Sequence, residues 1–230
     1  MAEDSIPRRG FLVGAGLATT AAASTLAGIA PAAAPAEPQP DAALTLNAPE
    51  MAFVIAAVDT LIPADELTPK GSECGVAAFI DRQLASAWGG GAKMYRSGPF
   101  LKGKPEHGYQ LPLSPRDYFA AGIAAVNQWT RKTKGKDFDR LTENEGVEVL
   151  KTLDAGKADL GEFNGAAFFD AFLTLTMEGF FSDPIYGGNR DKVAWKMVGF
   201  PGLPALYADK IEPYRGKRYE PAPQSIADFS

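Results

Sequence analysis

Four segments of this sequence begin with a helix-capping residue and continue with apolar residues at helical spacing, and this feature constrains the fold most. Asn47 is followed by Ala48-Pro49-Glu50, so Asn47 can cap a helix and Glu50 can close a capping box. Ser114, Thr142 and Asn164 open later segments in a similar way. Apolar residues then recur every three or four positions, and strand-like alternation is nowhere sustained. The pattern predicts an all-α fold.

The predicted architecture is an irregular bundle of about five main helices joined by long loops rich in Gly, Pro and aromatic residues. We expect the helices at about 47–62, 72–88, 114–132, 142–153 and 164–180. The loop 93–113 is longer than a compact domain normally carries, so it is expected to be functional or to bind a partner. The domain is assigned to 47–215 and residues 216–230 to a C-terminal tail.

The N-terminal residues have the three-part composition of an export signal. Arg8 and Arg9 precede an uncharged run from Gly14 to Ile29, and small residues of the Ala-x-Ala form follow as far as Ala36. Paired arginines ahead of such a run are typical of the twin-arginine type. A retained membrane anchor is the alternative, although the run is below the ~18–20 strongly apolar residues of a spanning helix.

We therefore expect residues 1–36 to be a cleaved twin-arginine signal peptide, with Arg8 and Arg9 as its export signal. Residues 37–46 are Pro/Ala-rich and are expected to form a flexible linker. The twin-arginine route moves folded proteins, so a chain that uses it folds, or assembles with a partner, before export. The mature protein is expected in the periplasm.

Charge and the scarcity of Cys and His exclude several functional classes. The net charge of −5 gives no electrostatic footprint for nucleic acid. Cys74 and His107 are the only residues of their types, so neither a His/Cys metal cluster nor a Cys-x-x-Cys-His haem site can form. No Gly-x-Ser-x-Gly elbow is present. We expect no catalytic, cofactor-binding or metal-binding residues in this chain alone.

Cys74 has two interpretations that the sequence leaves open. It lies in Glu73-Cys74-Gly75-Val76, near the expected start of a helix, where the thiol can pack inward. A lone cysteine in an oxidising compartment can instead pair with a cysteine of another chain. The sequence thus gives either a buried thiol or an intersubunit disulfide.

The segment 176–202 departs from the helical pattern and combines glycines with large apolar residues. Gly permits positive φ and close backbone approach, whereas Trp, Tyr, Phe, Met and Arg are enriched at interfaces. The segment is therefore either a partner-binding surface or a structural Ω-loop folded on its own core. The candidate interface residues are Glu178, Gly179, Phe180, Asp183, Pro184, Tyr186, Gly187, Gly188, Asn189, Arg190, Trp195, Met197, Phe200 and Pro201.

Four of these residues carry specific alternatives. Asp183 and Arg190 can clamp a ligand, but an ion pair between them that holds the loop is favoured. Glu178 can gain a raised pKa by burial, but a hydrogen bond to the following turn is favoured. Trp195 can stack on a sugar, yet a Trp at helical spacing usually belongs to the core.

The sequence resembles the gluconate 2-dehydrogenase subunit 3 family. The resemblance rests on Glu-Gly-Phe-Phe-Ser-Asp-Pro-Ile-Tyr-Gly-Gly-Asn-Arg at 178–190 and Trp-Lys-Met-Val-Gly-Phe-Pro-Gly at 195–202. Shorter matches are Leu-Ile-Pro-Ala-Asp at 61–65, Phe-Ile-Asp-Arg-Gln-Leu at 79–84 and Tyr-Arg-Ser-Gly-Pro-Phe at 95–100. It covers about residues 50–210.

This resemblance implies a non-catalytic small subunit of a membrane-associated periplasmic dehydrogenase. The implied partners are a large subunit of the glucose-methanol-choline type, which holds FAD, and in many complexes a multihaem cytochrome c subunit. The small subunit would help the large one to mature and carry it through the twin-arginine translocon. The alternatives are an independent exported enzyme or sugar-binding protein that uses the 178–202 loop, and a subunit that completes the active-site wall.

Overall fold

The computed structural model describes residues 42–101, 103–104, 107–204 and 206–229, and over these residues the all-α prediction is confirmed. Arg8, Arg9, the expected signal peptide 1–36 and most of the expected linker lie outside the described residues. The chain divides into two compact units, and the description below concerns the second, 41–230.

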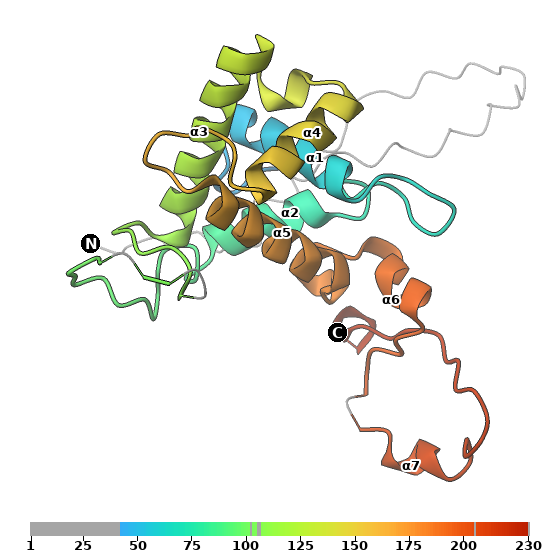
Figure 1. The fold of residues 1–230 in the computed structure, drawn as a ribbon. Coiled ribbons are helices and arrows are strands. Elements are labelled where there is room, and N and C mark those ends of the chain that lie inside the picture. The colour runs from blue at the N-terminus through green and yellow to red at the C-terminus, as the bar shows by residue number, and fades with distance from the viewer. Residues whose placement is uncertain (1–41, 102, 105–106, 205, 230) are drawn as a thin grey trace, which may run out of the picture. The chain divides into compact units, whose positions relative to one another are not determined.

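The five predicted helices are present as α1 (Ala48–Leu61), α2 (Val76–Ala85), α3 (Pro115–Lys134), α4 (Glu143–Asp154) and α5 (Gly165–Phe181) (Figure 1). Two short helices that the sequence did not predict follow, α6 (Val193–Val198) and α7 (Ala208–Ile211). Four 3-10 turns complete the described elements: η2 (Phe138–Arg140), η3 (Pro184–Tyr186), η4 (Arg190–Lys192) and η5 (Ile226–Phe229).

The predicted caps form as expected. The Asn47 side chain accepts the Glu50 N–H at 2.9 Å, and the Glu50 carboxylate accepts the Asn47 N–H at 2.9 Å. Thr142 and Glu145 form the same reciprocal pair at the start of α4. Each N-cap contributes about 1 kcal/mol, because it pairs N–H groups that the first turn leaves without a helical acceptor.

The second helix is shorter at both ends than the sequence predicts. Residues 71–75 form a turn, and Gly75 has a left-handed φ of 84°, so α2 begins at Val76. Ser86 is extended, with a ψ of 176°, and ends the helix before Trp88. The apolar spacing of 76–84 is helical, but it contains no signal for these two breaks.

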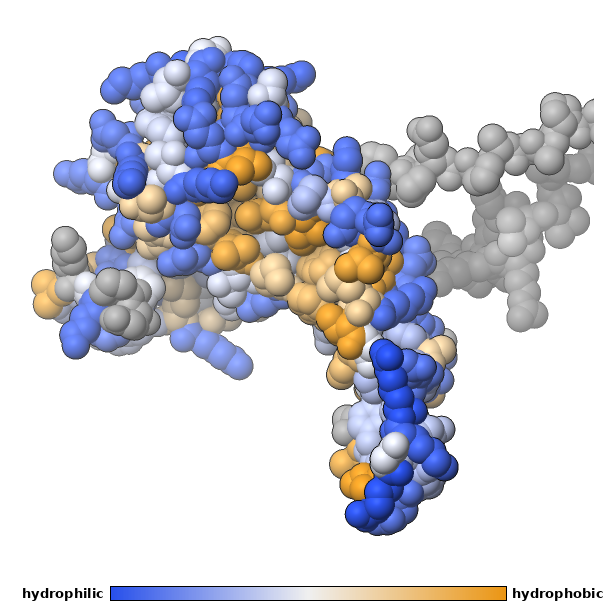
Figure 2. Space-filling view, turned by 45° about the vertical axis from the view of Figure 1, so that its right-hand side comes forward, coloured by the Kyte–Doolittle hydropathy of each residue, from blue (hydrophilic) through white to orange (hydrophobic). Residues whose placement is uncertain are grey.

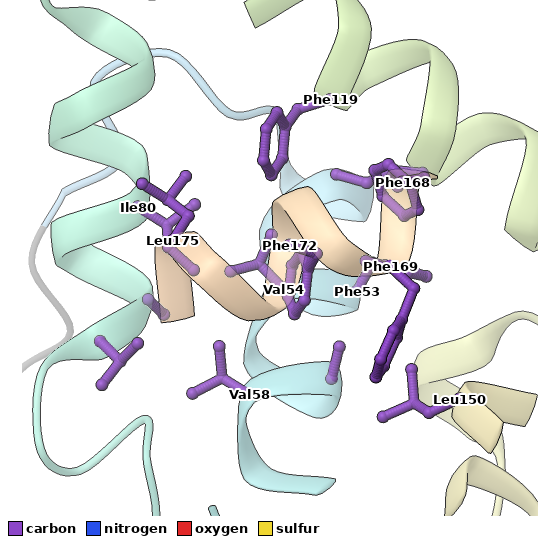
Figure 3. Close-up of a cluster of buried hydrophobic side chains, with 14 of the residues drawn as sticks. Phe53, Val54, Val58, Ile80, Phe119, Leu150, Phe168, Phe169, Phe172 and Leu175 are labelled. Carbon is purple, nitrogen blue, oxygen red and sulfur yellow. The ribbon is translucent and has the colours of Figure 1, made fainter. Parts of the chain in front are cut away.

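The core is built around α5. Its side chains Phe168, Phe172 and Leu175 are buried among α1, α2 and α3, as Figure 3 shows. The rings of Phe53 and Phe172 meet edge to face, with centroids 6.1 Å apart. A Cβ at Gly122 of α3 would lie 2.3 Å from the Phe168 ring, so glycine sets the approach of α3 to α5. Burial of each Phe side chain contributes about 2–3 kcal/mol.

The residues before α1 are fixed to α2 by one carboxylate. Asp81 is only 2% exposed and accepts the backbone N–H groups of Leu44, Thr45 and Leu46 at 2.5, 3.0 and 2.8 Å. Leu46 is buried beside α2 in the same core. Residues 44–46, which the sequence assigns to the flexible linker, therefore belong to the folded domain.

The C-terminal residues return to the segment that follows α5. We call residues 224–229 the strap and residues 203–223, which carry α7, the arm (Figure 1). The Ile226 N–H donates to Asp183 at 2.9 Å, and Lys192 pairs with Asp228 at 2.6 Å. Gly202 and Gln224 form an isolated parallel bridge at the base of the arm. The strap, assigned from the sequence to a tail, is thus part of the domain.

Candidate functional site

The segment 178–202 folds through close approaches that only glycine permits. A Cβ at Gly188 would lie 2.0 Å from the Gly179 carbonyl oxygen of α5. A Cβ at Gly75 would lie 2.3 Å from the Gly187 carbonyl oxygen, and Gly187 itself has a φ of 102°. The turn after α5 is therefore pressed against both the end of α5 and the start of α2. These glycines are structural, as the Ω-loop interpretation predicts.

Asn189 connects the end of α5 to the start of α6. The residue is fully buried; its amide donates to the Ser182 carbonyl at 2.9 Å, and its side-chain oxygen accepts the Ala194 N–H at 2.9 Å. Its φ of 45° is left-handed, a conformation that Asn tolerates better than most residues. Because both ends of the amide are bonded to backbone, Asn189 fixes the course of the chain between the two helices.

Asp183 and Arg190 have separate partners, and the ion pair favoured from the sequence is not found between these two described residues. The Asp183 carboxylate caps η3 by accepting the Ile185 N–H at 3.0 Å and also accepts the Ile226 N–H of the strap. Arg190 donates from its backbone N–H to the Cys74 carbonyl at 2.9 Å and from its guanidinium to the Glu73 carbonyl. Both residues therefore hold the loop, but to different parts of the chain.

The exposed fractions of Trp195 and Glu178 bear on the alternatives given for these two residues. Trp195 is 6% exposed, donates its indole N–H to the Phe181 carbonyl at 2.9 Å and meets the Phe200 ring edge to face. Trp195 is therefore a core residue, as expected for a Trp at helical spacing. Glu178 is exposed on α5, so the burial on which its alternative role depends is absent.

A large part of the same segment presents apolar side chains to the surface. Figure 2 shows apolar side chains gathered on the face from which the arm leaves. Seven large residues between the end of α5 and Phe200, two residues beyond α6, are 37–56% exposed: Met177, Phe181, Ile185, Tyr186, Met197, Val198 and Phe200. The strap adds Ile226 and Phe229, at 40% and 65%. We call these nine residues the C-terminal apolar surface.

The fourteen candidate interface residues thus fall into three groups. Gly179, Phe180, Gly188, Asn189 and Trp195 are buried and form the scaffold. Asp183, Pro184, Gly187, Arg190 and Pro201 are half-buried, and Glu178, Tyr186, Met197 and Phe200 are exposed. The sequence missed Met177, Phe181, Ile185, Val198, Ile226 and Phe229, because an apolar residue near a helix end gives no signal of the face it occupies.

Cys74 is buried beneath this segment. It is 1% exposed, its thiol lies 3.5 Å from the Pro69 carbonyl oxygen, and its own carbonyl accepts the Arg190 N–H. Burial raises the pKa of the Cys74 thiol. The arrangement favours the buried-thiol interpretation over a disulfide to another chain.

Two hollows lie elsewhere in the described part of the chain. One, of about 370 Å³, lies between α1 and α4 and is lined by residues that include Asp59, Lys70 and Glu143. The other, of about 430 Å³, lies within the predicted long loop and is lined by residues that include Tyr95, His107 and Tyr109. Among the described residues, no three His, Cys, Asp or Glu side chains are grouped as metal ligands. No helix in this part of the chain is long and apolar enough to cross a membrane.

Fold and site together define an all-helical domain whose C-terminal segment is a glycine-built scaffold that displays an apolar surface. The sequence matches the model of the gluconate 2-dehydrogenase subunit 3 family over residues 48–202, which include α1 to α6 and the scaffold. The chain belongs to this family, whose name is that of one subunit of a multi-subunit dehydrogenase. Neither a curated protein nor a solved structure matches the chain.

Proposed function

We propose that this chain is the non-catalytic small subunit of a periplasmic FAD-dependent dehydrogenase and binds its flavoprotein partner through the C-terminal apolar surface. The observation that carries the proposal is the exposure of this surface. Seven of its nine residues lie in the segment 177–200, within the part of the chain that matches the family. Exposed apolar patches on soluble proteins mark interaction sites, and Tyr, Phe and Met are enriched there. FAD belongs to the large subunit and haem c to a cytochrome subunit where one is present; this chain binds neither alone.

The scaffold beneath the surface suits a docking role better than a ligand site. Asn189, Asp183 and Arg190 are the polar groups that a small ligand would need, and each is bonded to the backbone of this chain. The apolar side chains above them are held by α5, η3 and α6 rather than by a loose loop. A pre-formed surface loses little conformational entropy on binding, so more of its contact energy appears as affinity.

The second part of the proposal is that the small subunit carries its partner through the twin-arginine translocon. Arg8 and Arg9 supply the export signal, and the large subunit would leave the cytoplasm only while bound to this chain. In the periplasm the complex associates with the membrane through its other subunits.

The first experiment isolates the complex. The full chain, tagged at its C-terminus, is expressed in its own cells, and the periplasmic proteins bound to the tag are recovered. We expect a larger polypeptide with the absorbance of bound flavin that reduces an artificial acceptor when gluconate or another sugar or polyol is added. A colourless, monodisperse small subunit would contradict the proposal.

The export role has a separate test. Arg8→Lys with Arg9→Lys should leave the flavoprotein in the cytoplasm and remove dehydrogenase activity from the periplasm. The matched control is Arg131→Lys with Arg140→Lys, which makes the same chemical change at two arginines of the folded domain. Normal periplasmic flavoprotein in the Arg8/Arg9 variant would show that the partner is exported without this chain.

A further inference from the structure

The arm lies outside the part of the chain that matches the family, yet it is firmly held at its base. The match ends at residue 202, where the arm begins. The Leu203 N–H donates to the Gln224 carbonyl at 2.9 Å, and the Gln224 N–H donates to the Pro201 carbonyl at 3.0 Å. A Cβ at Gly202 would lie 2.0 Å from the Gln224 carbonyl oxygen. The arm is thus anchored directly beside Phe200 of the C-terminal apolar surface.

Aromatic contacts give the arm a defined form. The Tyr219 ring meets the Tyr214 ring at 4.6 Å and the Tyr207 ring at 6.1 Å between centroids. The Tyr207 hydroxyl donates to the Gly202 carbonyl at 2.5 Å, so this group is tied to the base. Three of the seven tyrosines of the chain lie in this segment. Because these contacts fix the path of the arm, its remaining side chains have a defined spatial arrangement.

The arm exposes large aliphatic side chains that its own contacts do not cover. Leu206 is 80% exposed and Ile211 is 63% exposed, and α7, which carries Ile211, has only four residues. A segment of this length without a core of its own is usually either functional or a linker, and the tyrosine contacts within the arm are not typical of a linker. Leu206 and Ile211 are therefore available for contact with an apolar partner surface.

The charges of the arm favour a protein over a lipid surface as that partner. The arm has four cationic and three anionic side chains, a net charge of +1. Lys210 pairs with Asp209, Arg215 with Glu212 and Arg218 with Glu220. Segments that bind anionic lipid present cations in excess, whereas tyrosines, arginines and a balanced polar rim are typical of protein interfaces.

We propose that the arm is a second docking element, which seats Leu206 and Ile211 in an apolar hollow with a polar rim on the flavoprotein subunit. This inference rests on the proposed function and extends the C-terminal apolar surface by way of Phe200 and the strap. The arm lies beyond the residues that match the family model, and in this proposal it adds selectivity to the docking surface within that match. The apolar surface holds the flavoprotein, and the arm distinguishes it from the flavoproteins of related complexes.

The test measures how fast the flavoprotein dissociates from the immobilised native complex, followed by flavin absorbance. Leu206→Ser with Ile211→Ser should increase the dissociation rate about tenfold to a hundredfold, as truncation of interface anchors does. The matched control is Leu44→Ser with Leu67→Ser, which are 66% and 69% exposed and lie outside the arm. The control should leave the rate unchanged.

A second variant replaces residues 205–222 with a Gly/Ser linker. The bridge between Gly202 and Gln224 is parallel, so the chain passes through both residues in the same direction. The linker must therefore return from the end of the first segment to the start of the second, which takes about ten flexible residues rather than a tight turn. Its thermal unfolding should match that of the wild type. Loss of flavoprotein with an unchanged fold supports the proposal.

The outcomes separate the inference from the function on which it rests. If the wild-type chain retains no flavoprotein, the proposed function and the arm proposal both fail. If it retains flavoprotein and both arm variants retain it equally well, only the arm proposal is overturned. Arm-dependent flotation of the partner-free chain with phosphatidylethanolamine–phosphatidylglycerol vesicles would overturn it in favour of a lipid surface. Arm-dependent dimers in light scattering would overturn it in favour of a second copy.

Discussion

At the scale of single residues, Cys74 gives a direct test of how the segment after α5 covers α2. The thiol is 1% exposed and burial raises its pKa, so little thiolate is present and little of it is accessible. Ellman's reagent should react with the native domain at least about a hundredfold more slowly than with the chain in denaturant, because local opening costs about 3 kcal/mol or more. Equal rates, or a covalent link to the partner in non-reducing gels, would contradict the buried position.

Glu145 predicts a pH dependence of stability. Hydrogen bonds from the Thr142 backbone and from Lys136 hold the pKa of the Glu145 carboxyl at about 2 in the folded domain, whereas the unfolded chain has the usual value of about 4.3. The stabilisation is therefore complete above about pH 5 and is lost as the pH falls towards 2. Glu145→Gln should lower the melting temperature at pH 7 and reduce its decline between these limits. Thermal unfolding of the wild type and the variant across this pH range tests the prediction. Melting temperatures that fall in parallel with pH in the two proteins would contradict it.

At the scale of elements, the turn 183–188 packs so closely on the end of α5 that one added methyl group at Gly188 should destabilise the domain. Gly188→Ala places a Cβ 2.0 Å from the Gly179 carbonyl oxygen, a backbone atom that cannot move without shifting α5. We expect a loss of about 2–3 kcal/mol, or about 5–10 °C in the melting temperature. Gly90→Ala is the control, since its nearest neighbour would lie at 3.6 Å. Equal melting temperatures for the two variants would show that the contact is not as close as described.

The elements also show where sequence reasoning succeeds. The helices with a side-chain cap, α1, α3, α4 and α5, begin where Asn47, Ser114, Thr142 and Asn164 predict, because a cap is a local interaction. α2 has no such cap, and its limits depend on the conformations of Gly75 and Ser86. α6 was missed because its start requires positive φ at Asp191 and Lys192. The contacts of Lys192 with Asp228 of the strap and with Asn189 compensate the cost of this conformation.

The candidate site was predicted only as a segment. The sequence placed Gly179, Gly187, Gly188 and Trp195 among the candidate interface residues and left the structural Ω-loop open as the alternative. The division between buried scaffold and exposed surface could not be predicted, because it depends on packing over long sequence distances. Asp81 and the strap were missed for the same reason: Asp81 binds residues 35–37 positions earlier, and Asp183 binds Ile226, 43 positions later. No local pattern encodes such pairs.

At the scale of the whole molecule, the C-terminal apolar surface should control solubility when the chain is expressed alone. Ile185→Lys with Val198→Lys should reduce self-association, because these side chains are 45% and 56% exposed and the lysines add like charges. Light scattering of the purified domain measures the effect. Leu44→Lys with Leu67→Lys adds the same charge elsewhere, and an equal improvement there would attribute the effect to net charge alone.

The return of the strap also has a consequence for synthesis. Residues 225–228 supply partners for Asp183 and Lys192, so the scaffold remains incomplete until a ribosome has passed residue 228. A message truncated after the codon for Gly202 would yield every main helix but leave η3 and η4 without these contacts. The scaffold can therefore be complete only in a chain whose translation has continued beyond the arm and through the strap. For the export route proposed above, these contacts would distinguish the complete chain from fragments that end before the strap.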